Sequence, residues 1–297
     1  MKIHVFTAVC GSKRCNLQCP YCVSKMTPSV GVDSKAEDVN WRNFGIACQF
    51  ALRNEVNTAL ITSKGETLLA PEVCGNYIQA CAAQGFPFIE IQTNGLCLLE
   101  MDRADALKRL QYWREEGLTL VCISIAHHDP EKNHQIVRPK GEFYNFWQIV
   151  ELLHEARLSV RINCTLTKAG YGGSPAEVAD GVREFLHRAQ VEEVEQTTVR
   201  EVEAPYETES EHVSQWVEEN RLEFGIDGVF DCFERRYSPT PLLALPHGGM
   251  VYDVAGQNSA WGTCLTESTN PEDIRQLIFF PDGHLRYSWK HTGAIIL

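Results

Sequence analysis

Residues 15–22 read Cys15-Asn-Leu-Gln-Cys19-Pro-Tyr-Cys22, which places three thiols within eight residues at C-x3-C-x2-C spacing. Thiolates bind soft metals, and a closed zinc or iron–sulfur site takes four ligands of this kind. Three thiolates on a four-iron cluster leave one iron free to bind a group that is not protein. The stretch therefore indicates an open iron–sulfur site. A zinc site that lacks its fourth ligand, or cysteines that merely pack, are the alternatives.

The motif resembles the signature of the radical S-adenosylmethionine (radical SAM) superfamily, C-x3-C-x-Φ-C, with Tyr21 at the aromatic position Φ. The resemblance implies one 4Fe–4S cluster on Cys15, Cys19 and Cys22, whose open iron binds S-adenosylmethionine (SAM). One-electron reduction would then cleave SAM and give a 5′-deoxyadenosyl radical, which abstracts hydrogen from a substrate. We expect the electron to come from an external flavodoxin- or ferredoxin-like donor.

Cys10 lies just upstream, so the region also reads as C-x4-C-x3-C-x2-C, a closed site with four thiolates. A closed cluster would transfer electrons or stabilise a fold, and it could not bind SAM through iron. Against this alternative, Cys10 ends an apolar run, and a free cysteine is commonly buried as a small hydrophobe. The remaining cysteines are scattered along the chain, so we expect one cluster and no auxiliary-cluster domain.

The composition is that of an ordinary globular chain of 297 residues, 44 % hydrophobic and 22 % charged. The net charge of −12 argues against nucleic-acid binding, which needs a basic patch. The apolar runs are shorter than the ~20 residues that span a bilayer, and the N-terminus lacks the apolar region of a signal peptide. Twelve cysteines in such a chain indicate free thiols in a reducing cytoplasm.

Strand-like and helix-like segments alternate through residues 1–205 in six strand–helix units. Such alternation predicts a parallel sheet, and right-handed crossovers curl it into an open barrel. The expected fold class is therefore α/β, a partial (β/α)6 TIM-like barrel. The expected strands are residues 2–9, 58–62, 88–92, 118–125, 158–167 and 194–202, and the expected helices are residues 37–53, 71–85, 102–116, 143–157 and 174–190.

Residues 206–297 differ in character, with an acidic helix between residues 207 and 225, Gly/Pro-rich turns, and strand-like runs at 277–280 and 285–289. We expect this second domain, a C-terminal α+β segment, to close the open side of the barrel and to contact the substrate. Each candidate residue in it is also compatible with a purely structural role. The candidates are Cys232, Arg235, Arg236, His247, Cys264, Arg286, Trp289 and His291.

Barrels of this kind carry their chemistry on loops at the carboxyl ends of the strands. Residues 63–67, Ser-Lys-Gly-Glu-Thr, follow the second strand where radical SAM proteins carry Gly-Gly-Glu, although Lys64 replaces the first glycine. Arg200, near the end of the sixth strand, would bind the SAM carboxylate or a substrate anion. Ordinary turns and a surface arginine are the alternatives. The resemblance implies SAM contacts at Tyr21, Gly65, Glu66, Asn94, Ser124, Asn163 and Arg200.

His127 and His128 follow the fourth strand, at the mouth of the expected barrel. Imidazoles at this position could bind a substrate or transfer protons, and solvated loop histidines are the alternative. Farther along the chain, Asn133, Arg138 and Gly141 resemble the sequence pattern of the molybdenum-cofactor cyclase and peptide-maturase branches of the superfamily.

The resemblance is specific for the start of the reaction and leaves its outcome open. With one cluster and no further electron acceptor, we expect rearrangement, elimination or epimerisation, the last with Cys232 or Cys264 as a thiol that returns hydrogen. The short N-terminus leaves no room for a leader-peptide-binding domain, which favours a small-molecule substrate. The alternatives are a ribosomal-peptide-modifying enzyme, a non-catalytic electron-transfer protein with Cys10 as fourth ligand, and a relative that binds SAM without cleaving it.

Overall fold

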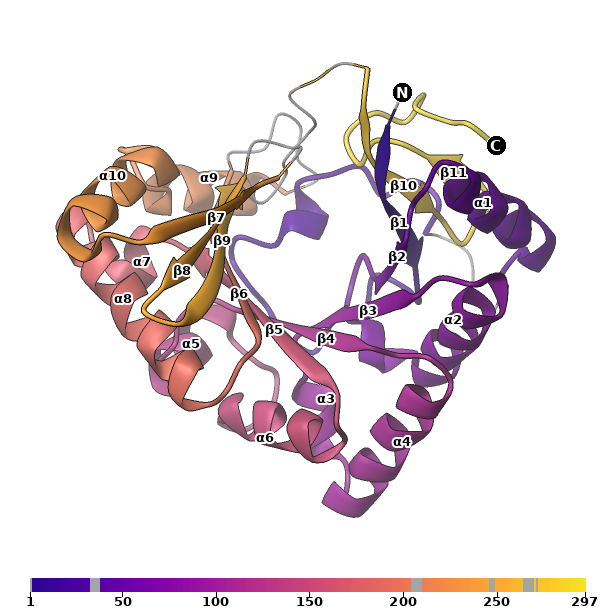
Figure 1. Ribbon diagram of the computed structural model, residues 1–297, viewed down its shortest axis with the longest axis horizontal. Helices are drawn as coiled ribbons and strands as arrows, with labels where there is room; N and C mark the ends of the chain where they lie inside the picture. The colour runs from indigo at the N-terminus through magenta and orange to yellow at the C-terminus, as the bar shows by residue number, and fades with distance from the viewer. Residues whose placement is uncertain (1, 33–37, 204–209, 246–248, 264–269, 271) are drawn as a thin grey trace.

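One curved sheet of eleven strands organises the chain (Figure 1). The structure is a computed structural model, and it describes residues 2–32, 38–203, 210–245, 249–263, 270 and 272–297. Along the sheet the strands follow the order β11-β10-β1-β2-β3-β4-β5-β6-β9-β8-β7. Six parallel strands form its centre: β1 (Ile3–Val9), β2 (Thr58–Thr62), β3 (Phe88–Thr93), β4 (Leu120–Ile125), β5 (Ser159–Leu166) and β6 (Gln196–Glu201).

The C-terminal segment adds strands to both edges of this parallel centre. β9 pairs parallel with β6, and β10 pairs parallel with β1, so the parallel run is eight strands long. The sequence analysis predicted only six, because the partner of a short strand depends on long-range register more than on its own residues. The added strands are β7 (Thr240–Ala244), β8 (Met250–Val254), β9 (Gln257–Thr263), β10 (Ile274–Phe279) and β11 (Leu285–Arg286).

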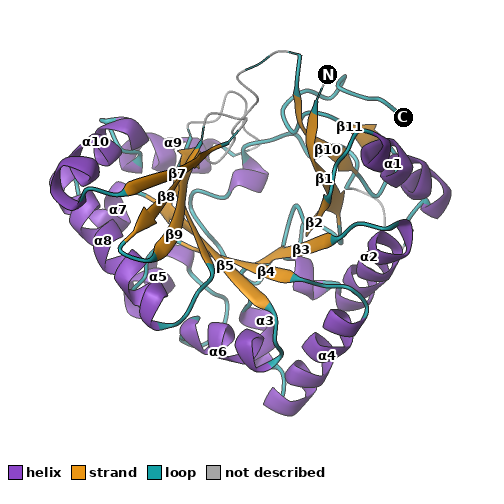
Figure 2. Cartoon of the chain, viewed as in Figure 1, coloured by secondary structure: helices purple, strands orange, loops and turns teal. Residues whose placement is uncertain are grey.

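Helices cover the outer face of the sheet, and the inner face surrounds the barrel interior (Figure 2). Several of their ends follow sequence signals: Pro71 begins α2, Gly85 ends it with a φ of 99°, and Ser174 forms a capping box with Glu177. α5 and α10 were not predicted. The α-helices are α1 (Trp41–Arg53), α2 (Pro71–Gln84), α3 (Leu96–Glu100), α4 (Arg103–Glu115), α5 (Pro130–Val137), α6 (Trp147–Glu155), α7 (Lys168–Tyr171), α8 (Pro175–Val191), α9 (Glu211–Asn220) and α10 (Gly225–Tyr237).

Side-chain alternation along the strands separates the hydrophobic core from the barrel interior. On β5, Val160 and Ile162 belong to the core, whereas Arg161 and Asn163 line the interior. The other central strands follow the same pattern, and their inward positions are largely polar. The interior is therefore a polar space enclosed by an apolar shell, which suits a bound ligand better than a packed core.

An aromatic cluster ties the C-terminal strand β10 to the N-terminal half of the chain. The ring of Phe44 on α1 lies 5.2 Å from Phe279 of β10, 5.8 Å from Phe6 of β1 and 5.0 Å from Tyr77 of α2. All four side chains are buried. Since each aromatic pair adds about 0.5–1.5 kcal/mol beyond its buried area, the cluster stabilises the β10–β1 edge.

The sheet does not close into a complete barrel. In the described part of the chain, β7 and β11 are the two edges and do not pair with each other. The C-terminal segment instead lines the open side with side chains from residues 272–276 and 287–291. Because both segments share one sheet, the division into domains at residue 205 stays a prediction. None of the described helices combines the length and the apolar character that crossing a bilayer requires.

Candidate active site

A cavity of about 1120 Å³ occupies the barrel interior. It is lined by the three motif cysteines and by each of the residues that the resemblance assigns to SAM, although these residues come from different strands and loops. The fold thus brings the predicted set together at one place, and the individual roles stay predictions. The set is Cys15, Cys19, Tyr21, Cys22, Gly65, Glu66, Asn94, Ser124, Asn163 and Arg200.

The segment that follows α5 holds the cysteine loop in place. Leu17 and Pro139 form an antiparallel bridge, and the backbone N–H of Gln18 donates to the Val137 carbonyl oxygen at 3.0 Å. The Lys140 ammonium donates to the carbonyl oxygen of Cys15 at 2.8 Å. These contacts hold the cysteine loop in place through its backbone, and none of them involves a sulfur atom of the three cysteines.

Burial and mutual repulsion make the motif thiols costly to ionise on their own. The pKa of Cys19 lies far above its usual value, chiefly because of burial, and the charges of Cys22 and Cys15 raise it further. Burial also raises the pKa of Cys15, although the Leu17 N–H, 3.4 Å from its sulfur, opposes the rise. A cationic metal centre stabilises such thiolates together, because a coordinated thiol is deprotonated.

The donor set is compatible with an iron–sulfur cluster. Each thiolate of a four-iron cluster binds a different iron, so the sulfur atoms need not meet at one point. Cys15, Cys19 and Cys22 all line the cavity and would hold such a cluster together. Among the residues that the structure describes, no three His, Cys, Asp or Glu side chains are arranged to hold one metal ion.

The structure contradicts the alternative in which Cys10 is a fourth ligand. Cys10 is fully buried, and its thiol hydrogen-bonds the Ala70 carbonyl oxygen at 3.8 Å and the Cys74 thiol. It does not line the cavity. Its side chain packs in the core beside α2, so the four-thiolate reading of the motif is wrong.

Cys97, near the start of α3, is a neighbouring thiol that the sequence analysis did not single out. The Asn16 amide donates to its sulfur at 3.5 Å. Burial, followed by the charges of Glu66, Glu100 and Cys15, raises the pKa of Cys97 to about 12. Cys97 is not among the cavity-lining residues, so its sulfur supports the loop from behind. No local pattern connects it to the motif, which explains why it was missed.

Gly65 lies directly against the backbone that leads into the cysteine loop. A Cβ atom at this position would come within 2.1 Å of the Arg14 carbonyl oxygen, so only glycine fits. The backbone N–H of Glu66 donates to the same oxygen at 2.8 Å. The Gly-Glu pair therefore sets where the cysteine loop begins.

The buried Glu66 carboxylate joins the turn after β2 to the turn after β3. It accepts hydrogen bonds from the backbone N–H groups of Leu68 and Asn94, each at 2.9 Å, and from the Thr93 hydroxyl. Burial raises the pKa of Glu66, and these three bonds oppose the rise. A carboxylate offers about four lone-pair sites, so one remains for a ligand such as an ammonium group.

Asn94 connects the same turn to the cysteine loop. Its Nδ2 donates to Asn16 Oδ1 at 2.8 Å and lies 3.9 Å from the sulfur of Cys15. Its Oδ1 accepts from the Leu96 N–H at 2.9 Å. The Asn94 amide thus stabilises the cysteine loop, in addition to any contact that it makes with SAM.

Lys64, which replaces a glycine of the family motif, is buried at the cavity wall. Its Nζ donates to the Thr27 carbonyl oxygen at 3.3 Å and to the Thr27 hydroxyl, and it lies 5.6 Å from the ring centroid of Trp289. Trp289 also lines the cavity and packs against Phe280, with the ring centroids 5.4 Å apart. The substitution therefore links the rim of the cavity to the C-terminal segment.

Ser124, Asn163 and Arg200 carry polar groups into the cavity from three adjacent strands. Asn163 is buried, and its Oδ1 has no hydrogen-bond partner among the described residues. Since an unpaired buried acceptor costs about 1–3 kcal/mol, a ligand donor at this point would stabilise the site.

His127 and His128 do not line the cavity. Their rings stack on each other with centroids 4.4 Å apart, and His127 also stacks on Tyr171 of α7 at 4.6 Å. Burial lowers the pKa of His127 to about 3, with a further contribution from the charge of His128. The expected role of this pair in substrate binding or proton transfer is not supported, because neither residue lines the cavity: His127 is buried and His128 is half-buried beside Glu184.

Two C-terminal candidates lie away from the cavity. Arg286 is buried and pairs with Asp282 through two hydrogen bonds of 2.7 and 3.1 Å, which makes it a structural ion pair and not a substrate contact. Cys232 on α10 packs against the core and does not line the cavity either. Its expected role as a hydrogen donor is therefore not supported.

The other C-terminal candidates have different placements. Arg235 and Arg236 are exposed on α10, outside the cavity. His291 lines the cavity, as Trp289 does. His247 and Cys264 lie outside the described residues.

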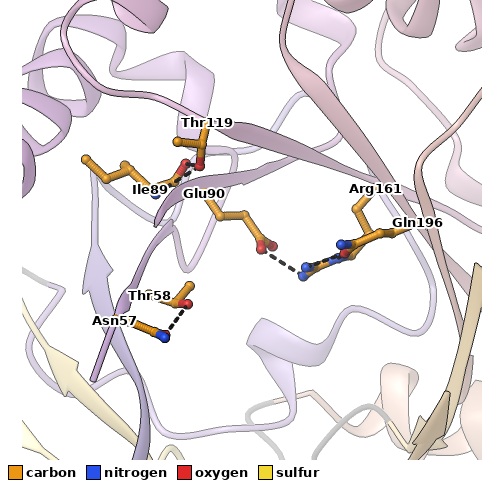
Figure 3. A network of polar contacts seen from close by, with 7 residues as sticks. All are labelled: Asn57, Thr58, Ile89, Glu90, Thr119, Arg161 and Gln196. Carbon is orange, nitrogen blue, oxygen red and sulfur yellow. Dashed lines mark hydrogen bonds and ion pairs between the residues drawn. The ribbon is translucent and has the colours of Figure 1, made fainter. Parts of the chain in front are cut away.

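An ion pair that the sequence analysis did not single out lies inside the barrel (Figure 3). Arg161 of β5 donates to Glu90 Oε2 of β3 at 2.7 Å and to Gln196 Oε1 of β6 at 2.9 and 2.7 Å. Glu90 is 5 % exposed, and its Oε1 has no described partner. The available signal was the inward position of each residue on its strand, because charged residues seldom face a barrel interior without a ligand or partner.

The family model of the radical SAM superfamily matches residues 9–189, which is more than half of the chain. The chain belongs to the radical SAM superfamily. The match begins at the end of β1, contains the cysteine motif and extends into α8. It therefore confirms the family that the motif predicted. No curated protein sequence matches the chain.

Solved structures of radical SAM proteins share the fold. Native anSMEcpe with bound AdoMet is similar with a TM-score of 0.55 and 14 % identity, over 96 % of this chain and 74 % of that one. SuiB from Streptococcus suis is similar with a TM-score of 0.52 and 13 % identity, over 96 % of this chain and 59 % of that one. This radical SAM chain thus spans less than two thirds of SuiB. These similarities confirm the expected partial barrel and concern the fold alone.

Proposed function

We propose that this radical SAM protein is an enzyme that binds one 4Fe–4S cluster through Cys15, Cys19 and Cys22, with SAM beside it. The observation that carries the proposal is the convergence on one cavity of the three thiols, the turns after β2 and β3, and inward side chains of β4, β5 and β6. When bound, the cluster and SAM supply a 5′-deoxyadenosyl radical, which abstracts hydrogen from a substrate.

The chain's own residues would act mainly by position. The Gly65 turn, the Glu66 carboxylate and the Asn94 amide hold the cysteine loop at the edge of the cavity. The remaining lone-pair site of Glu66 can accept a hydrogen bond from the ammonium group of SAM. The unpaired Oδ1 of Asn163 can accept another from SAM or from the substrate. Tyr21 and Ser124 complete the proposed set of cofactor contacts, and Arg200 would bind either the SAM carboxylate or a substrate anion.

The size of the cavity favours a small-molecule substrate. Its volume of about 1120 Å³ slightly exceeds the roughly 300–1,000 Å³ of ordinary small-molecule sites, which leaves room for SAM and a small partner. Among the described residues, rearrangement and elimination fit best, because Cys232 lies away from the cavity; epimerisation through Cys264 is not tested, since Cys264 lies outside them. A ribosomal peptide is the second candidate, since the unclosed sheet leaves one side through which an extended chain could enter.

The proposal also includes an external one-electron donor of the flavodoxin or ferredoxin type and a reducing compartment such as the cytoplasm. The described cysteines form no disulfide, which agrees with such a compartment. The net charge of −12 supports the expectation that nucleic acid is not a partner.

Anaerobic reconstitution with iron and sulfide, followed by SAM and dithionite, tests the proposal through mass spectrometry of 5′-deoxyadenosine. We expect product from the wild type and none from a variant with Cys15→Ala, Cys19→Ala and Cys22→Ala, because it cannot hold the cluster. Cys232→Ala is the matched control, since it removes a thiol that lies outside the cavity and leaves the motif intact. A wild type with its full iron content that makes no 5′-deoxyadenosine would contradict the proposal.

A further inference from the structure

Two guanidinium groups in the barrel interior have no carboxylate partner. Charged side chains of both signs line the cavity: Lys64, Arg161, Arg200, Arg275, Lys290, Glu66, Glu90, Glu272 and Asp273. Glu90 pairs with Arg161 at 2.7 Å. Among the described residues, no carboxylate forms an ion pair with Arg200 or Arg275.

Arg275 and Arg200 influence each other across the unclosed side of the sheet. Arg275 is the second residue of β10 and Arg200 the fifth of β6, at opposite ends of the parallel run. Burial lowers the pKa of Arg275 to about 10, and the charge of Arg200 contributes to the shift. Two like charges that burial has partly removed from water are costly unless a counter-charge joins them.

One polar atom of Arg275 is also left without a partner. Its Nη1 is buried and has no hydrogen bond in the described part of the chain. The nearest carboxylate along the strand, Asp273, accepts from the Lys2 backbone N–H at 3.1 Å and lies 3.8 Å from His4. An anionic ligand in the cavity could accept a hydrogen bond from this unpaired guanidinium N–H. The planar guanidinium group of arginine matches the geometry of carboxylate and phosphate oxygens.

We propose that Arg200 and Arg275 together bind an anionic group of the substrate, a carboxylate or a phosphate, inside the barrel. The inference rests on the proposed function, because it takes the cavity to be the place where the radical meets its substrate. It also decides between the two roles considered for Arg200, in favour of the substrate anion.

The position of Arg275 favours the substrate over SAM as the source of the anion. β1 and β10 run parallel with Ala8 opposite Phe279, so their carboxyl ends lie at the same level as the cysteine loop. Arg275 precedes Phe279 by four residues, and at ~3.3 Å per residue its backbone lies roughly 13 Å below that level. The methionine carboxylate of SAM belongs beside the cluster at the upper end, whereas a substrate would extend below it.

Thermal unfolding of the reconstituted protein in inorganic phosphate or in succinate, against sodium chloride at equal ionic strength, tests the inference. We expect at least one of the two anions to raise the Tm of the wild type in a saturable manner. Arg200→Gln and Arg275→Gln should each weaken the apparent affinity for that anion about tenfold or more, because one of the two guanidinium groups that bind it is lost. Arg114→Gln, an exposed position on α4, is the matched control and should keep the response.

Two further measurements separate the competing explanations. In chloride alone, Arg275→Gln should unfold at the same temperature as the wild type or higher, because it removes repulsion; a marked fall in Tm would show a structural role and overturn the inference. The affinity for SAM, measured by equilibrium dialysis, should not follow the affinity for the anion. A parallel loss of both in Arg275→Gln would assign the anion to SAM and also overturn it.

The inference and the proposed function fail separately. A wild type that makes 5′-deoxyadenosine but shows no saturable response to phosphate or succinate overturns the anion site and leaves the radical chemistry standing. A wild type that responds to an anion through Arg200 and Arg275 but makes no 5′-deoxyadenosine supports the anion site and contradicts the proposed function.

Discussion

At the rim of the cavity, the turn at Gly65–Glu66 and the side chain of Asn94 direct most of their polar atoms to the protein itself. In the interior, Nη1 of Arg275 and Oε1 of Glu90 have no described hydrogen-bond partner, and Arg200 lines the cavity without an ion pair in the described part of the chain. The rim is thus built before any ligand arrives, whereas the interior depends on a ligand to satisfy its charges. This contrast fits a cofactor that is common to a whole family and a substrate that is particular to one member.

The largest effect on stability is expected from Glu90→Gln, which leaves three interior guanidinium groups without a carboxylate. Removing one partner of a buried ion pair typically costs 3–5 kcal/mol, and we expect about 3 kcal/mol because Arg161 keeps some access to water. Urea unfolding of the variant measures the loss. Glu155→Gln is the matched control, because its pair with Arg103 is exposed and should be worth less than about 1 kcal/mol.

Adding Arg161→Gln to Glu90→Gln should recover much of that stability, because the unpaired charge disappears with its partner. If the two single substitutions instead destabilise the protein additively, charge pairing does not organise the interior, and the contrast with the rim would lose its basis.

A smaller loss is expected at the rim from Gly65→Ala. The added Cβ would lie 2.1 Å from the Arg14 carbonyl oxygen, so the turn or the cysteine loop must move, at a cost of about 2 kcal/mol. Urea unfolding and the iron content after reconstitution should both fall. At Gly141 a Cβ would meet nothing within 4 Å, so Gly141→Ala should change neither. Equal behaviour of the two variants would show that the rim tolerates movement.

At neutral pH the smallest effect is expected from the stacked histidines, and this effect grows as the pH falls. The pKa of His127 falls from its usual 6.5 to about 3 on folding, so between these values the unfolded chain binds more protons than the folded one. Stability from His127 is therefore present above pH 6.5 and is lost as the pH falls, by at most about 1.4 kcal/mol per pH unit.

His127→Asn isolates this contribution, because its amide oxygen can still accept from the Asp129 N–H, as His127 Nδ1 does at 2.9 Å. The difference in unfolding free energy between wild type and variant should shift against the wild type from pH 6.5 towards pH 4. A difference that does not change with pH would mean that His127 titrates normally, as a solvated group at the cavity mouth would.

The rim could be predicted from the sequence because its signals are local. Cys15, Cys19 and Cys22 are close in the chain, and the end of each parallel strand marks where its loop must lie. The interior was missed because Arg275 reaches the cavity only through the pairing of β10 with β1, which no short pattern encodes. The stacking of His127 on Tyr171 was hidden for the same reason, since it depends on how α7 packs.

The pairing of β10 with β1 has a consequence for how the chain folds. β1 is synthesised well before its second neighbour in the sheet, residues 274–279, because the pairing of Ile3 with Ile274 joins positions 271 residues apart. Until then, one edge of β1 presents unpaired N–H and C=O groups, which are a template for pairing with another chain. Contacts across such a sequence separation also form slowly. A chain that ends before residue 274 would keep the cysteine motif and yet be prone to self-association.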